Sequence, residues 1–91
     1  MLVIIKNAPD SPEARRGLTL ARDTGADVAL IQNGVYFLSQ GGLEGLPGAV
    51  YALEPDILLR GEGARPGAAR LLGYDGLVEL MARAGKVTGA F

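Results

Sequence analysis

Two carboxylates, Glu54 and Asp56, are the residues whose types and spacing first suggest chemistry. Paired carboxylates can act as a general acid and a general base. These two also flank Pro55, and this pattern is typical of a helix start, where acidic side chains lie at the positive end of the dipole. We therefore interpret them as helix-start residues. An enzyme that uses carboxylate and lysine chemistry ranks last among the functions that we consider.

The absence of two residue types excludes most other catalytic chemistry. The 91 residues include no cysteine and no histidine. The chain thus lacks a thiol nucleophile, a thiolate metal ligand and the commonest general base. Serine–histidine and cysteine–histidine triads are excluded, and a structural zinc site nearly so. We predict no catalytic residue, no metal and no cofactor.

Charge and length indicate a small globular protein. The chain has 9 basic and 10 acidic residues, and this balance predicts no direct binding of nucleic acid or of an anionic membrane. Its length suits one core, so we predict a single domain over residues 1–91. No stretch reaches the ~20 apolar residues of a membrane span, and the first ten residues do not resemble a signal peptide. We expect a cytoplasmic protein.

Short apolar runs alternate with helical patterns along the chain. Strands are predicted over 2–5, 28–31, 49–53 and 70–72. Helices are predicted between Asp10 and Gly25, between Glu54 and Gly61, and from an N-cap at Asp75 to Gly85, with a tail after it. This alternation predicts an α/β fold with three layers, α/β/α, around a mostly parallel sheet of four to five strands.

The dipeptide Asn33-Gly34 leaves two structures open for the residues that follow it. Asn-Gly between apolar runs is a strong hairpin signal. The alternative is a turn followed by a short helix from Val35. The local pattern does not decide between them, whereas the strand–helix alternation favours the helix. Glycine-rich loops are predicted over 41–48 and 61–69.

Polar residues follow each predicted strand. They are Lys6-Asn7, Gln32-Asn33, Glu54 and Tyr74-Asp75. The carboxyl ends of parallel strands share one edge of a sheet, and ligands bind beyond that edge. Strands must also end in turn residues, which is an ordinary structural explanation for the same side chains. A homo-oligomer that binds a small ligand at this edge is therefore an alternative function.

Three longer stretches carry a family resemblance. They read LIQNGVYFL (30–38), VYALEPDILLRG (50–61) and GYDGLVELMARAGKVTGAF (73–91). They resemble the DsrE/DsrF/DsrH-like sulfur-relay family, and within it the DsrH/TusB branch. The resemblance implies a small α/β/α fold and a complex with cysteine-containing DsrE/TusD-like and DsrF/TusC-like paralogues. Such complexes pass persulfide sulfur, toward 2-thiouridine at the tRNA wobble position or in sulfur oxidation.

This sequence departs from the sulfur-carrying members of that family. Their working cysteine stands just after the third strand, where this chain has Leu53, Glu54 and Pro55. Some relatives of the branch have a cysteine in the first helix, where this chain has Leu18. Because a persulfide forms on a thiolate, this chain cannot carry sulfur covalently. The resemblance thus implies a non-catalytic docking or structural subunit.

Eight residues are predicted as interface or family-motif positions. They are Asn33, Gly34, Tyr36, Phe37, Asp56, Arg60, Tyr74 and Phe91. We expect Tyr36, Phe37 and Phe91 to belong to an apolar surface that is buried against the paralogues. A turn, a helix dipole and a helix end are ordinary structural explanations for the glycine, the aspartate and the arginine of this set.

Overall fold

The computed structural model describes residues 1–61 and 69–91, and these form a five-stranded parallel sheet with the strand order β4-β3-β2-β1-β5. The strands are β1 (Leu2–Ile5), β2 (Asp27–Leu30), β3 (Val50–Leu53), β4 (Arg70–Leu72) and β5 (Val87–Thr88). The helices are α1 (Pro12–Thr24), the 3-10 helix η1 (Gln32–Tyr36), α2 (Phe37–Gln40), α3 (Glu54–Leu59) and α4 (Tyr74–Arg83). The predicted α/β fold with a parallel sheet is confirmed.

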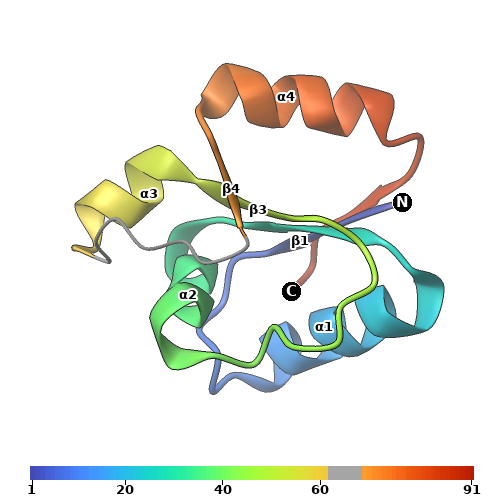
Figure 1. Cartoon of the computed structure of the whole chain (residues 1–91), viewed down its shortest axis with the longest axis horizontal. Helices are drawn as coiled ribbons and strands as arrows, with labels where there is room; N and C mark the ends of the chain where they lie inside the picture. Colours follow the sequence, from blue (N-terminus) through green and yellow to red (C-terminus); the bar gives the residue numbers. More distant parts are fainter. Residues whose placement is uncertain (62–68) are drawn as a thin grey trace.

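The helices form layers on the two faces of the sheet. Helices α1 and α2 lie on one face, α4 lies on the other, and α3 extends beyond the end of β3 (Figure 1). None of the helices in the described part of the chain is long and apolar enough to cross a membrane.

Both faces of the central strands are buried, which explains their unalternating apolar sequences. Successive residues of a strand point to opposite faces. Val3 and Ile5 therefore pack in the cluster that includes Leu18 of α1. Leu2 packs in the cluster with Leu80 of α4.

Helix α1 begins and ends at the predicted signals. The Ser11 side chain accepts a hydrogen bond from the Ala14 N–H at 3.1 Å, and Pro12 occupies the first turn. Gly25 has a φ of 73° and donates its N–H to the carbonyl of Ala21 at 2.9 Å. A left-handed glycine is the common way to end a helix.

After Gly34 the chain is helical, so the helical alternative is confirmed and the hairpin is excluded. Gly34 is buried against β1, and a Cβ on this residue would collide with the carbonyl oxygen of Ile5. The close approach of two backbones therefore requires glycine at this position.

Two details of the carboxyl-terminal part differ from the sequence prediction. Helix α4 begins at Tyr74, with Gly73 at the cap position, so Asp75 lies in the first turn and is not the N-cap. The predicted tail contains β5, which pairs in parallel with β1 through Leu2↔Val87 and Val3↔Thr88. A strand of two residues is too short to show a hydrophobic pattern in the sequence. It forms because the side of β1 that faces away from β2 offers backbone groups for pairing.

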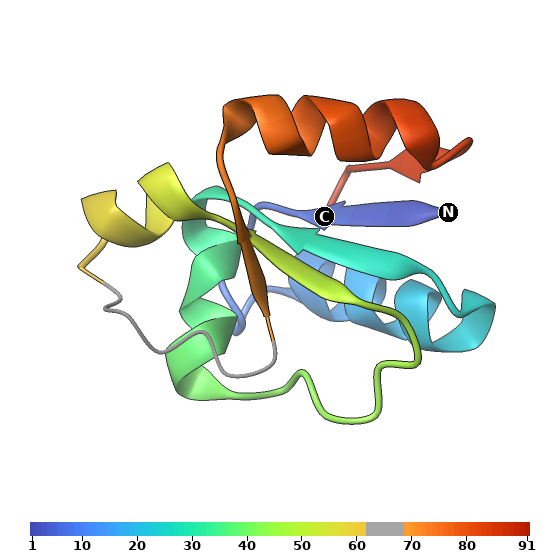
Figure 2. The ribbon, with the colours of Figure 1, turned by 45° about the horizontal axis from the view of Figure 1, so that its top comes forward.

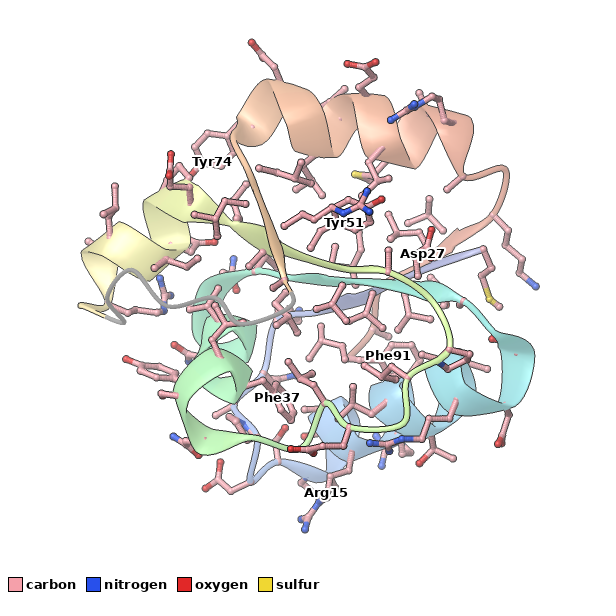
Figure 3. All side chains as sticks on the ribbon, viewed as in Figure 1. Arg15, Asp27, Phe37, Tyr51, Tyr74 and Phe91 are labelled. Carbon is pink, nitrogen blue, oxygen red and sulfur yellow. The ribbon has the colours of Figure 1, made fainter. Side chains whose placement is uncertain are left out.

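The last residue described, Phe91, packs on the α1 face of the sheet (Figure 3). Its carbonyl oxygen accepts hydrogen bonds from the backbone N–H of Asn7 at 3.3 Å and from Asn7 Nδ2 at 2.9 Å. A Cβ on Gly17 would lie 2.8 Å from Phe91 Cβ and 3.2 Å from Ile5 Cγ1. The glycine in the middle of α1 thus makes room for the phenylalanine.

We predict that Gly17→Ala lowers the free energy of unfolding by about 1 kcal/mol, because overpacking against Phe91 outweighs the higher helix propensity of alanine. Urea titration measures the change. In a Phe91→Gly background, which removes the Cβ atom as well as the ring, the same substitution is expected to be neutral or stabilising. Gly76→Ala in α4 is the matched control, since an added Cβ there would meet the flexible end of Leu72 at 3.3 Å. An equal loss in both backgrounds would contradict this explanation.

Candidate functional site at the carboxyl edge of the sheet

Asp56 is the centre of a polar cluster at the edge where the strands end. It lies in the first turn of α3, directly after β3, and is 8% exposed. Its Oδ2 atom accepts a hydrogen bond of 2.7 Å from the backbone N–H of Gln32, the first residue of η1. The carboxylate therefore connects the segment after β3 to the segment after β2.

Arg60 extends this cluster from the other end of α3. Its Nη1 atom lies 3.4 Å from Asp56 Oδ1, and the two side chains are 19% and 12% exposed. Its Nε atom donates a hydrogen bond of 3.0 Å to Asn33 Oδ1. The structure thus brings together three of the residues selected from the sequence, Asn33, Asp56 and Arg60.

The geometry of this cluster suits positioning rather than reaction. A partly buried carboxylate is paired with a guanidinium group, and the guanidinium also binds an amide oxygen, so each charged group has a partner. The same carboxylate holds Gln32, whose φ of 48° is in the left-handed region, where residues other than glycine are uncommon. The cluster therefore fixes the turn after β2 and the orientation of α3.

The two predicted carboxylates have different environments. Glu54 is exposed, whereas Asp56 is buried and paired with Arg60. Across residues 1–61 and 69–91, no group of three or more acidic, histidine or cysteine residues is placed to hold a metal ion. Of the other polar residues that follow strands, Lys6 is exposed and Asn7 binds the carbonyl of Phe91.

One of the predicted interface aromatics belongs to the core. Phe37 is 3% exposed and packs with buried residues of α1 and the sheet, so it presents no surface to a partner. The sequence did not show which of two adjacent helical residues points inward. Tyr36 and Phe91 are half-buried, and Tyr74 is 61% exposed.

A hollow of ≈ 430 Å³ lies away from this edge. It is bounded by α2, by the segment after α2 and by the first residues of β3 and β4, with Leu38, Leu43 and Val50 among its apolar lining. None of Asn33, Asp56 and Arg60 lines it. Most of the predicted loop 61–69, which precedes β4, lies outside the described residues.

Two exposed leucines on α3 were not selected from the sequence. Leu58 is 75% exposed and Leu59 is 78% exposed, while the preceding Ile57 is buried. Three consecutive apolar residues cannot all point inward from a helix. The run Ile57, Leu58, Leu59 therefore already indicated in the sequence that apolar side chains of this helix are exposed. We call Leu58 and Leu59 the α3 pair.

The family of the chain follows from its comparison with known proteins. Residues 11–87 match the model of DsrH-like proteins. The chain belongs to the DsrH-like family. Members of this family are associated with sulfur-relay complexes. The family match confirms the resemblance, and it covers the cluster of Asn33, Asp56 and Arg60.

A solved structure has the same fold as this DsrH-like chain. The solution NMR structure of protein Tm0979 from Thermotoga maritima is 26% identical in sequence and has a TM-score of 0.67. The similarity covers 94% of this chain and 97% of that chain. No curated protein matches this chain.

We predict that Asp56→Ala lowers the free energy of unfolding by about 2–3 kcal/mol, because it removes a charged acceptor and leaves Arg60 without its carboxylate. Glu54→Ala is the matched control in the same helix turn, and its expected effect is within about 0.5 kcal/mol, as for most exposed sites. Both values come from urea titration. Equal effects of the two substitutions would show that Asp56 is only a helix-dipole partner.

Proposed function

We propose that this chain is a non-catalytic subunit of a sulfur-relay complex and that it docks cysteine-containing partners. The observation that carries the proposal is the absence of cysteine from a member of the DsrH-like family. Since persulfide transfer needs a thiolate, the sulfur stays on the partners. The proposed partners are cytoplasmic DsrE/TusD-like and DsrF/TusC-like paralogues, and the proposed pathway is tRNA thiolation or sulfur oxidation.

The α3 pair supports a docking role. Two adjacent leucines, 75% and 78% exposed, are apolar surface of the kind that is enriched in the centre of protein interfaces. They follow Asp56 within the same helix, and the bonds of Asp56 and Arg60 hold that helix against η1. A rigid element that presents apolar side chains loses little entropy on binding.

The proposal predicts which proteins co-purify with the chain. A tagged chain expressed in its native host is expected to recover two cysteine-containing paralogues in equal amounts, as measured by mass spectrometry. Replacing the α3 pair by Leu58→Glu and Leu59→Glu is expected to reduce this recovery by about tenfold or more, because a charge would be desolvated in the interface.

The control variant is Val78→Glu, which places a glutamate on an exposed valine of a different helix, α4. We expect it to recover the paralogues as the unchanged chain does. Recovery of the tagged chain alone would overturn the docking role. It would favour the alternative of a homo-oligomer with a ligand at the edge of the sheet.

A further inference from the structure

A hollow of ≈ 360 Å³ lies between α4 and the amino ends of the strands, at the edge of the sheet opposite to Asp56. Three polar side chains from three elements line it. Asp27 begins β2, Tyr51 lies in β3, and Arg83 ends α4. The other lining residues are Met1, Leu2, Leu80 and Ala84. The hollow thus combines polar groups with an apolar wall, as small-molecule sites do.

The register of the sheet places Asp27 and Tyr51 on the same face. Asp27 pairs with Leu2, and Tyr51 pairs with Ala29. Leu2 and Ala29 both belong to the cluster under Leu80 of α4. Paired residues of neighbouring parallel strands point to the same face, so Asp27 and Tyr51 point toward α4 as well. Figure 3 shows Tyr51 on this side of the sheet, and Figure 2 shows α4 as the helix that covers it.

The polar groups of this hollow have unused bonding capacity. Asp27 Oδ1 accepts a hydrogen bond of 2.9 Å from the Ala49 backbone N–H, whereas Asp27 Oδ2 has no partner in the described part of the chain. Within residues 1–61 and 69–91, Arg83 forms no ion pair and Tyr51 Oη forms no hydrogen bond. A carboxylate and a guanidinium group therefore face one hollow without contacting each other.

We propose that this hollow binds a small zwitterion, namely a free α-amino acid with an apolar side chain. The ligand carboxylate accepts hydrogen bonds from Arg83 and from Tyr51 Oη. The ligand ammonium group donates to Asp27 Oδ2, and the ligand side chain lies on Leu2 and Leu80. One acidic and one basic side chain line the hollow, so a ligand with one charge of each sign matches both.

The size of the hollow limits the size of the ligand. Small-molecule sites usually measure ~300–1,000 Å³, so this hollow of ≈ 360 Å³ is near the lower limit. It suits a single amino acid better than a nucleotide or a peptide. Arg83 is exposed, and water weakens the attraction of an exposed charge. We expect a dissociation constant on the order of 1 mM.

Nuclear magnetic resonance of the isotope-labelled full chain, titrated with L-leucine from about 0.1 to 20 mM, tests the proposal around that dissociation constant. We expect saturable shifts of the amide signals of Asp27, Tyr51 and Arg83. Two analogues of leucine each lack one charge, since isocaproate has no ammonium group and isoamylamine has no carboxylate. Each analogue is expected to bind about tenfold more weakly than leucine, because charge-assisted hydrogen bonds are lost.

Two variants test the two charges of the protein. Asp27→Asn keeps an Oδ1 acceptor for Ala49 and removes the charge. It is expected to weaken leucine about tenfold and not to weaken isocaproate, which brings no ammonium group. Arg83→Gln is expected to weaken leucine about threefold or more. Glu79→Gln, which is exposed on the same helix and does not line the hollow, is the matched control and is expected to bind leucine normally.

The absence of saturable shifts at these residues would overturn the proposal. So would an analogue that binds as tightly as leucine, which would indicate a site for an anion or a cation only. Equal weakening of leucine and isocaproate by Asp27→Asn would also contradict it, because the carboxylate would then not hold the ammonium group. The experiment contains no paralogue, so its failure leaves the docking role of the α3 pair standing, and failure of that role leaves this site standing.

Discussion

The hydrogen bond between the Asp56 carboxylate and the Gln32 backbone N–H is the interaction on which the carboxyl edge of this protein depends. Among residues 1–61 and 69–91, Asp56 is the one charged residue that is buried. A buried carboxylate is stable only when its oxygens have partners, and here a backbone N–H and Arg60 provide them. One side chain thereby sets the turn after β2, the start of α3 and the direction in which the α3 pair is presented.

The small size of the chain explains why so much apolar surface remains exposed. A five-stranded sheet has two faces to cover, and in the described part of the chain α4 is the helix on one of them. The core is completed on the α1 side, where Phe91 also packs. Leucines of α3 and the side chains of Tyr74, Val78 and Met81 on α4 are left at the surface, and association with other chains buries such surface. This exposed apolar surface supports the docking role proposed for the chain.

Local signals in the sequence predicted much of this fold, and the misses have physical reasons. The start of α1 after Asp10, its end at Gly25 and the unalternating strands depend on nearest neighbours, so pattern alone located them, whereas the choice of Ser11 as the cap came from the structure. The helix after Gly34 needed the global alternation, because Asn-Gly fits a hairpin equally well. Strand β5 and the inward direction of Phe37 depend on tertiary contacts that no local pattern contains.

The site was predictable in its residues but not in its geometry. The family resemblance singled out Asn33, Asp56 and Arg60, and of these three the strand-end rule placed only Asn33 at the edge of the sheet. Arg60 binds Asn33 across 27 residues of the chain, and Asp56 binds the Gln32 backbone across 24. Only the fold shows that Asp56, interpreted from the sequence as a helix-dipole partner, is a buried residue that connects two segments.

We propose that this chain, which has no thiol, serves sulfur transfer by holding other subunits in place. The most direct measurement is the rate of persulfide transfer between the two cysteine-containing paralogues, reconstituted with and without this chain. We expect the rate to fall when the chain is omitted, and to fall equally when the α3 pair is replaced by glutamates in a folded chain. A transfer rate that is the same with and without the chain would contradict it.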